Sequence, residues 1–470
     1  MPSEPHLHPN PHAPASGLAL AFGQRVAAFQ WADVTPAALR WAKVGILDTV
    51  GVTLAGAREP AALMLAQVVG PAAGASVVFG SRLRASPFDA ALINGTAAHA
   101  LDFDDCNNTF GGHPSVPILP ALFALADEMG ATGADFITAY IAGFELECKL
   151  ALSVHFHHYS KGWHPTATLG VFGAAAACAR LLRLTAEQTA TALALAAAGS
   201  AGIKANFGTM TKPMHVGRCA REGLLAARLA QAGFTANKDS VFEHEHGFFE
   251  VYNGAGNYDP ARGIQAWADP LDIVTPGIAI KQYPCCGSTH PAIDAAIALA
   301  QAERIEPDQV ERVDVWIHPR RLQHTNRPAP QSDLDAKFSV QYVVARALLD
   351  GRVTLEHFEQ QRFRELPVAA LMQRVHAVGY DADRFAPDNH FAGEVRLLLR
   401  DGRVRSAKVE QPLGRTSDNP LPDDRLQAKF AACASRVLSN DAVRASVATL
   451  KRFETLADVR ELTRHLATDL

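Results

Sequence analysis

The sequence has no marked excess of charge of either sign and no long run of apolar residues. Its 470 residues include 44 Lys and Arg against 48 Asp and Glu, which gives a formal net charge of −4. Without an excess of positive charge, neither nucleic acid nor an anionic membrane surface is expected as the main partner. The most apolar stretch, residues 189–201, is too short to cross a bilayer of about 30 Å. We therefore predict no nucleic-acid partner and no membrane partner.

Cysteine is also scarce; its odd number argues against a disulfide framework, and its spacing contains no CxxC metal or redox motif. The chain has an odd number of cysteines, seven, and no two are separated by two residues. They are Cys106, Cys148, Cys178, Cys219, Cys285, Cys286 and Cys433. This usage is typical of a protein in the reducing cytoplasm, and we expect a cytoplasmic location.

The N-terminal segment lacks the basic and apolar regions of a signal peptide. Residues 1–16 are rich in Pro and include His6, His8 and His12. We predict a disordered tail whose histidines have no chemical role.

What is abundant is an Ala- and Leu-rich pattern of helical length. It recurs from Gly17 to about Gly233, for example in "TPAALRWAKVGILDTVGVTLAG" (35–56) and "TAEQTATALALAAAGSAG" (185–202). Beyond Pro276 the pattern alternates as in strands, in "QVERVDVWIHP" (309–319) and around a short turn in "GEVRLLLRDGRVRSAKVE" (393–410). After residue 416 the helical pattern returns.

A chain of this length is too long for one core. We predict a mainly α protein, with a large all-helical domain formed by the N- and C-terminal segments and a smaller inserted α+β lid domain. The expected boundaries are 17–278 for the helical domain, 279–415 for the lid and 416–470 for the C-terminal helices that return to the helical domain.

Four ionisable residues stand directly before a proline that precedes a helical run. They are His113, His164, Lys212 and His290. Proline favours the first helical position, so each side chain is expected at a helix N-terminus, where free N–H groups and the helix dipole attract anions. The same field disfavours an imidazolium, so a histidine there can stay neutral and act as a base. A purely structural role remains open for each one taken alone.

The segment "HALDFDDCNNTFGGHPS" (99–115) admits several interpretations. Asp102 falls three residues after His99, which would place both on one helix face. We expect Asp104 and Asp105 to point to water in a turn, so that replacing Asp104 by Asn has little effect. A metal site is the alternative, but no paired motif such as HExxH is present, and we predict no metal.

Two further clusters are interpreted as structural. Cys285 and Cys286 precede His290 and could supply a nucleophilic thiol, but adjacent side chains rarely face one site, so buried loop thiols are expected. In "FHHYSKGWH" (156–164) the Gly-Trp pair is expected to aim His164, which leaves His157 and His158 at the surface.

Six motifs together resemble the MmgE/PrpD family, which includes 2-methylcitrate dehydratases, cis-aconitate decarboxylases and an iminodisuccinate epimerase. The motifs are "NGTAAHALDFDD", "GGHPSVPILPAL", "KGWHPTATLGVFGAAAA", "ANFGTMTKPMHVGRCAREG", "KQYPCCGSTHPAIDAA" and "NRPAPQSDLDAKFSVQY". The resemblance implies a helical domain with an α+β lid, a homodimer and catalysis without metal or another cofactor. The Ala-rich helices, whose flat apolar faces need covering, also favour a homodimer.

The resemblance also implies the site residues. Those that match the decarboxylase branch are Asp102, His113, His164, Lys212 and Lys281. Three positions depart from that branch: Cys106 replaces Thr, Cys286 replaces His, and His324 replaces Tyr. These departures argue against cis-aconitate decarboxylation and leave the general machinery in place.

We therefore expect a cofactor-free lyase that acts on a small di- or tricarboxylate by acid–base elimination, most like a 2-methylcitrate dehydratase. The expected catalytic residues are His113 and His164 as acid and base, Lys212 holding a carboxylate, and Asp102 orienting an imidazole or a lysine. The expected substrate-binding residues are Lys281, Cys106, Cys286 and His324, the last as a possible extra proton donor. Decarboxylation or epimerisation by the same proton chemistry is the alternative, and a non-catalytic protein that binds a polycarboxylate or a partner is an alternative of another class.

Overall fold

The computed structural model describes residues 17–302 and 306–468. The predictions for the tail, including His6, His8 and His12, therefore lie outside the described residues. The structure is 58% helix and 9% strand, which confirms a mainly helical protein with a small sheet. Within the described ranges we find no helix that is both long and apolar enough to cross a membrane.

The chain divides into two compact units, which we name the helical unit and the sheet unit. The helical unit contains residues 17–100, 104–278 and 424–468 of the described chain. The sheet unit contains Leu101–Phe103 together with residues 279–302 and 306–423. Three residues from the N-terminal half thus group with the sheet unit.

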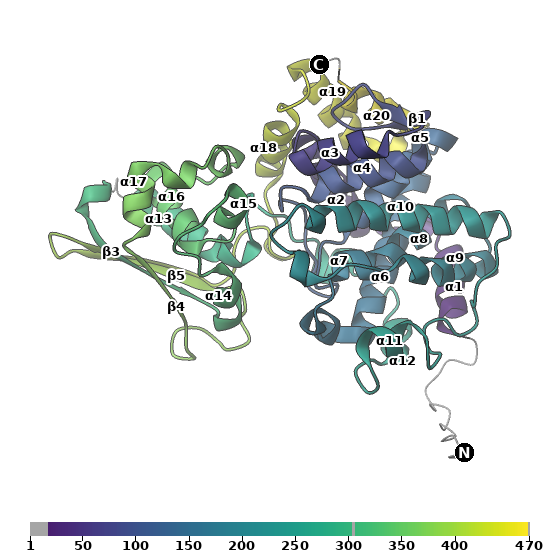
Figure 1. Cartoon of the computed structure of the whole chain (residues 1–470), viewed down its shortest axis with the longest axis horizontal. Coiled ribbons are helices and arrows are strands. Elements are labelled where there is room, and N and C mark those ends of the chain that lie inside the picture. The colour runs from purple at the N-terminus through teal and green to yellow at the C-terminus, as the bar shows by residue number, and fades with distance from the viewer. Residues whose placement is uncertain (1–16, 303–305, 469–470) are drawn as a thin grey trace. The chain divides into compact units, whose positions relative to one another are not determined.

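Most of the helical unit is helix, with one short antiparallel hairpin (Figure 1). Its elements are α1 (Leu18–Ala28), α2 (Pro36–Gly56), α3 (Pro60–Val69), β1 (Ala73–Val77), β2 (Arg84–Ala85), α4 (Pro87–His99), α5 (Ser115–Met129), α6 (Gly133–Lys161), α7 (Pro165–Thr168), α8 (Gly170–Leu181), α9 (Ala186–Gly199), α10 (Thr211–Gln231), α11 (Phe248–Asn253), α12 (Pro260–Gln265), α18 (Asp423–Ala434), α19 (Asn440–Lys451) and α20 (Arg460–Leu466).

The two helices quoted from the sequence begin at the caps that their residues provide. The Thr35 side chain accepts a hydrogen bond from the backbone N–H of Ala38, and Pro36 takes the first position of α2. At α9, Thr185 and Gln188 form a reciprocal capping box. Both predicted helices are confirmed.

Glycines allow α4 and α10 to approach closely. A Cβ on Gly95 of α4 would lie 2.9 Å from the Cα of Gly217 on α10, and a Cβ on Gly217 would lie 2.2 Å from the backbone oxygen of Leu92. Only a hydrogen in place of a side chain fits at this crossing. Since α4 ends at His99 and α10 carries Lys212 in its first turn, the packing also sets the place of two residues of the candidate site.

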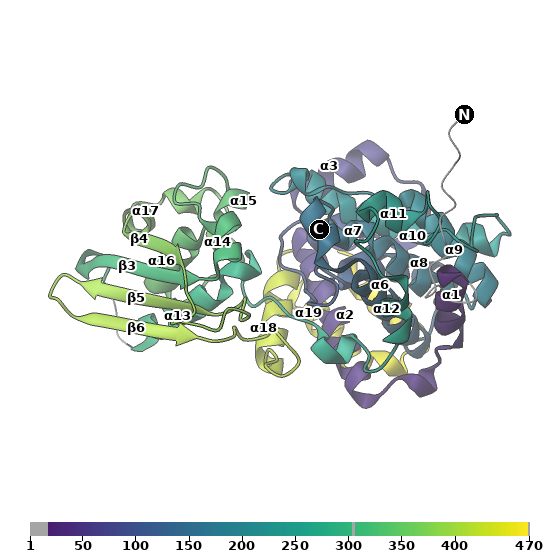
Figure 2. The same cartoon turned by 90° about the horizontal axis from the view of Figure 1, so that it is seen from below.

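The sheet unit is built on four strands in the order β4-β3-β5-β6 (Figure 2). The central pair β3–β5 and the pair β5–β6 are antiparallel, whereas β3–β4 is parallel. The predicted strand at 309–319 and the hairpin around Asp401 and Gly402 are confirmed, and β4 is an addition that the sequence pattern did not predict. The elements are α13 (His290–Ala302), β3 (Val310–Ile317), α14 (Pro319–Thr325), α15 (Asp333–Ala336), α16 (Val340–Asp350), α17 (Leu366–Met372), β4 (Val375–Gly379), β5 (Gly393–Leu399) and β6 (Val404–Val409).

Lysine side chains attach Leu101–Phe103 to the rest of the sheet unit. Lys337 Nζ donates to the backbone oxygens of Leu101 and Pro284, each at 2.9 Å. Lys281 Nζ donates to the backbone oxygen of Asp102 at 2.6 Å. Both ammonium groups are buried, so these carbonyl oxygens compensate for lost hydration.

Candidate active site

The four ionisable residues that precede proline all lie where a helix begins. His164 is the N-cap of α7, and Pro114, next to His113, is the N-cap of α5. Lys212 lies in the first turn of α10, and His290 is the first residue of α13. The predicted helix positions are therefore confirmed.

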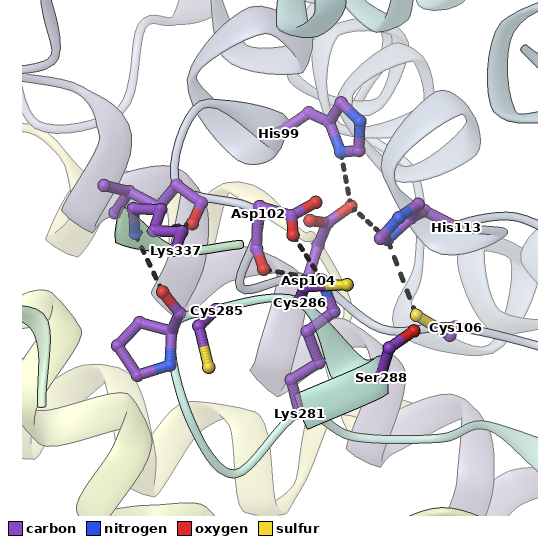
Figure 3. A network of polar contacts seen from close by, with 12 residues as sticks. His99, Asp102, Asp104, Cys106, His113, Lys281, Cys285, Cys286, Ser288 and Lys337 are labelled. Carbon is purple, nitrogen blue, oxygen red and sulfur yellow. Dashed lines mark hydrogen bonds and ion pairs between the residues drawn. The ribbon is translucent and has the colours of Figure 1, made fainter. Parts of the chain in front are cut away.

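Asp104 is fully buried, so the prediction that it points to water is wrong. Its Oδ2 lies 2.7 Å from Nδ1 of His99 and 3.1 Å from Nδ1 of His113 (Figure 3). Burial would raise the pKa of Asp104, but the charges of His113 and His99 and their hydrogen bonds lower it well below its usual value. Burial lowers the pKa of His99 to about 4, against the opposing effect of Asp104. The arrangement is an ionised carboxylate that accepts from two imidazoles.

The predicted pairing of His99 with Asp102 on one helix face is also wrong. Helix α4 ends at His99, and Asp102 has a φ of 54°, in the left-handed region. Asp102 therefore leaves the helical path, and the carboxylate beside His99 is that of Asp104.

Asp105 is buried as well, with a different partner, so its predicted exposure is wrong. The Ser115 hydroxyl donates to Asp105 Oδ2, and the Ser115 backbone N–H donates to Oδ1 at 3.3 Å. The Ser115 hydroxyl oxygen also lies 2.5 Å from the hydroxyl of Tyr140. Burial raises the pKa of Asp105 well above its usual value and so favours the neutral carboxyl.

The loop between Asp104 and His113 is closed by its own backbone. The N–H of Asn107 donates to the oxygen of Gly112 at 3.1 Å, and the Asn107 side chain donates to the oxygen of Gly277 at 2.9 Å. This closure brings the sulfur of Cys106 to 3.7 Å from Nδ1 of His113. Cys106, predicted to bind substrate, thus lies beside the predicted catalytic histidine.

His164, predicted to be catalytic, is buried among other cationic or titratable side chains. Its Nδ1 lies 3.3 Å from Nδ1 of His215, and its ring stacks on that of His99 with centroids 5.6 Å apart. The ammonium of Lys212 lies 5.2 Å from the ring centroid of Phe207, whose edge also meets His164. Burial, followed by the charges of His99 and Lys212, lowers the pKa of His164 well below its usual value. His164 is therefore neutral near pH 7.

One group of side chains could hold a metal ion. Single ligand atoms of His99, Asp104 and His113 all lie within 4.8 Å of one another. Their contacts have the lengths of hydrogen bonds from two N–H groups to a carboxylate. The positive charge of Lys212 acts on His99 and opposes a further cation there. The absence of a metal stays a prediction.

In the sheet unit, the predicted residues Asp102 and Lys281 form an ion pair. Lys281 Nζ lies 3.1 Å from Asp102 Oδ2, in addition to its hydrogen bond to the Asp102 backbone oxygen (Figure 3). The sequence predicted that Asp102 orients either an imidazole or a lysine. In the sheet unit its partner is a lysine, Lys281.

Cys286 and His324 also lie together in the sheet unit. Burial would raise the pKa of Cys286, but a hydrogen bond to His324 and the charge of that histidine lower it to about 7. His324 Nε2 lies 3.1 Å from the Ser288 hydroxyl. Burial raises the pKa of the adjacent Cys285 to about 12. The two neighbouring thiols therefore differ in reactivity.

His158 is fully buried, so its predicted place at the surface is wrong. Its Nδ1 lies 3.0 Å from Asn253 Oδ1 and its Nε2 lies 2.7 Å from Thr168 Oγ1. The ring stacks with Trp163 and Tyr252. Burial lowers its pKa to about 4, and its side-chain contacts with Asn253 and Thr168 indicate a structural role. His157 is half-buried.

The predicted residues thus form two groups, one in each unit. The helical unit holds Cys106, His113, His164 and Lys212, and the sheet unit holds Asp102, Lys281, Cys286 and His324.

Sequence reasoning missed His99, Asp104 and His215 as members of the helical group. The spacing of Lys212 and His215, three apart on α10, was a signal for His215 because such residues share a helix face. Nothing in the local sequence distinguishes Asp104 from Asp105.

Comparison with known proteins finds similarity along nearly the whole chain. The profile of the MmgE/PrpD N-terminal domain matches residues 21–261, and that of the MmgE/PrpD C-terminal domain matches residues 283–454. The chain belongs to the MmgE/PrpD family. The resemblance found in the six sequence motifs is therefore confirmed.

Individual relatives are lyases of two kinds. The chain is 32% identical to human cis-aconitate decarboxylase over 461 residues, covering 94% of this chain and 93% of the relative. It is 28% identical to cis-aconitate decarboxylase of Aspergillus terreus strain NIH 2624, with 92% of each chain covered. It is 24% identical to 2-methylcitrate dehydratase of Escherichia coli strain K12, with 82% and 83% covered.

These similarities support an enzyme of the lyase class. They favour the alternative reading, a decarboxylase, over the preferred dehydratase, because the decarboxylases match with higher identity over more of the chain. The departures at Cys106, Cys286 and His324 concern three positions, whereas the likeness to the decarboxylase extends over 461 residues.

Proposed function

We propose that the protein is a decarboxylase of a small unsaturated tricarboxylate of the cis-aconitate type. The observation that carries this proposal is the 32% identity to human cis-aconitate decarboxylase over 94% of the chain. The cluster of imidazoles and a lysine in the helical unit agrees with it, because the reaction needs a proton donor and cations.

The chemistry of cis-aconitate defines what the site must supply. The molecule has three carboxylates around one carbon–carbon double bond. When the carboxylate of its CH₂–COO⁻ group leaves as CO₂, the electron pair of the broken bond forms a new double bond to the central carbon. The pair of the old double bond takes one proton at the outer carbon. The products are CO₂ and a five-carbon dicarboxylate, so the reaction consumes one proton and needs no oxidant.

His113 and His164 are the proposed proton carriers. Burial and nearby charges keep His164 neutral in the free protein. A bound polycarboxylate brings negative charge close to these rings, which favours the imidazolium. Substrate binding would thus favour protonation of a histidine ring. That imidazolium would then donate its proton to the outer carbon of the substrate as a general acid.

The other residues have proposed binding roles. Lys212 holds a substrate carboxylate from the first turn of α10, where the helix N-terminus adds to the attraction. Lys281, oriented by Asp102, is a second carboxylate ligand. Cys106, Cys286 and His324 contribute to substrate recognition. No metal or organic cofactor enters this scheme.

A second candidate is a hydro-lyase on a 2-methylcitrate-like acid. The similarity to the Escherichia coli dehydratase over 82% of the chain favours it, and neutral histidines could remove the α-proton. The two reactions differ in their products, since one releases CO₂ and the other water.

Turnover by the purified protein distinguishes the two. The protein is mixed separately with cis-aconitate and 2-methylcitrate in D₂O, and products are followed by NMR together with released CO₂. Decarboxylation predicts CO₂ and one deuterium on carbon in the product from cis-aconitate.

The matched variants for this assay are His164→Gln and His246→Gln, of which only the first changes a buried histidine of the cluster. His164→Gln should lose activity, whereas His246→Gln, which changes an exposed side chain, should keep it. Dehydration of 2-methylcitrate without CO₂ release from cis-aconitate would overturn the proposal in favour of the second candidate.

A further inference from the structure

We propose that Asp104 is a positioning residue that fixes His113 as the tautomer protonated at Nδ1, so that Nε2 is the atom that exchanges a proton. The inference rests on the proposed function in that it assumes that His113 transfers protons. It adds a residue that neither the sequence motifs nor the similarities assign to the site.

The short contact between the Asp104 carboxylate and His113 carries the proposal. Asp104 Oδ2 lies 3.1 Å from His113 Nδ1, within hydrogen-bond distance of an N–H donor. An ionised carboxylate can only accept, so the proton of this contact must reside on Nδ1. In a neutral imidazole the other nitrogen, Nε2, is then left with a lone pair.

The Cys106 thiol makes a competing but weaker contact at the same nitrogen. Its sulfur lies 3.7 Å from His113 Nδ1, and a neutral thiol is both a weak donor and a weak acceptor, whereas the ionised carboxylate makes a stronger, charge-assisted hydrogen bond. The carboxylate therefore decides the tautomer.

His99 holds Asp104 in place. Its Nδ1 donates to the same Oδ2 at 2.7 Å, and its side chain has no exposed surface. Within residues 17–302 and 306–468, His99 Nε2 has no hydrogen-bond partner, so the contact with Asp104 is what satisfies this ring. The edge of one imidazole meets the face of the other between His99 and His113, with centroids 4.7 Å apart. Asp104 thus has two donors that prevent its carboxylate from turning away.

Asp105 provides a matched control. It is the next residue, equally buried, and its partner is the Ser115 hydroxyl. Burial favours the neutral form of Asp105, whereas the two imidazoles favour the charged form of Asp104, so Asp105→Asn changes the local charge less than Asp104→Asn does.

The direct test is an NMR measurement of the histidine tautomer, which needs no substrate. Ring-¹⁵N-labelled histidine is incorporated into the full chain, and the His113 signals are identified by their loss in His113→Gln. The wild type should have a protonated Nδ1 and an unprotonated Nε2 at His113. Asp104→Asn should abolish this fixed assignment, and Asp105→Asn should preserve it.

A wild-type His113 protonated at Nε2 would overturn the proposal, as would an unchanged tautomer in Asp104→Asn. If Asp104→Asn does not fold, the His113 tautomer seen in the wild-type spectrum is by itself the test of the proposal. Stoichiometric metal in the wild type that is lost in Asp104→Asn would also overturn it, in favour of a metal site at His99, Asp104 and His113.

Kinetics with a turned-over substrate separate positioning from binding. Asp104→Asn should lower kcat by about 10²-fold or more with KM changed little, because it affects the proton-transfer step. An equal rise in KM with kcat intact would contradict the role. The tautomer result stands whether or not cis-aconitate is the substrate, so the two proposals fail separately.

Discussion

The three aspartates between Leu101 and Cys106 have different partners and therefore different electrostatic environments. Asp102 pairs with the ammonium of Lys281, and Asp104 accepts from two imidazoles. Asp105 has a serine hydroxyl and an N–H as donors, and burial raises its pKa well above the usual value. Identical side chains within four residues thus have an ion-paired, an imidazole-bound and a serine-bound environment, because the local partners outweigh the residue type.

At the same scale, substitutions of His113 and Lys212 should have different kinetic effects. His113→Ala removes a proton carrier and should lower kcat by about 10²- to 10⁴-fold. Lys212→Ala removes a positive charge that already binds the substrate before the reaction begins, so it should also raise KM. Steady-state kinetics on each variant measure both. A His113→Ala enzyme with near-normal kcat would exclude that histidine as a proton carrier.

Cys286 should react with alkylating reagents more readily than its neighbour. Because its pKa is lowered to about 7 while that of Cys285 is raised to about 12, only Cys286 is substantially a thiolate between pH 7 and 9. Iodoacetamide labelling followed by peptide mass spectrometry should show Cys286 modification rising through pH 7. Cys286→Ser should remove the signal, whereas preferential labelling of Cys285 would contradict the assignment.

The sequence could identify candidate residues but not their partners. His113, His164 and Lys212 were recognisable because proline fixes a helix start next to each. The burial of Asp104 was not recognisable, because it depends on His99 and His113 at either end of an irregular segment whose path is set by the closure between Asn107 and Gly112.

At the level of elements, α6 carries a histidine that should make the protein sensitive to acid. His158 is neutral when folded, with a pKa of about 4, against 6.5 for an ordinary histidine. Below pH 6.5 the unfolded chain gains a proton that the folded chain cannot accept, so stability is lost as the pH falls from 6.5 toward 4. The full effect is about 3 kcal/mol.

Urea unfolding at pH 7.5, 6 and 5, followed by circular dichroism, measures this loss. His158→Gln should flatten the pH dependence, whereas His246→Gln, at an exposed site, should not. An identical slope in His158→Gln would mean that another group causes the sensitivity.

Elements with strong local signals were predictable, and those defined by distant pairing were not. Helices α2 and α9 are each directly preceded in the sequence by their N-cap residue, Thr35 and Thr185 respectively. Strand β4 has five residues, and only the first is buried, so it lacks the alternation that marks a half-buried strand. It exists because its backbone pairs in parallel with β3, more than 60 positions earlier.

At the level of the whole molecule, we predict a homodimer. The family resemblance implies it, and so do the Ala-rich helices with flat apolar faces. Light scattering on a dilute sample should give twice the chain mass. A fully active monomer at the same concentration would refute the prediction.

The grouping of Leu101–Phe103 with the sheet unit limits how this chain can be divided. The boundary between the two family domains falls between residues 261 and 283, which suggests a convenient cut for separate expression. A fragment that begins there lacks the backbone oxygens of Leu101 and Asp102, on which the buried ammonium groups of Lys337 and Lys281 depend. We therefore expect the C-terminal domain to be unstable when expressed alone, and exchanging it between relatives should require the three-residue segment to be transplanted with it.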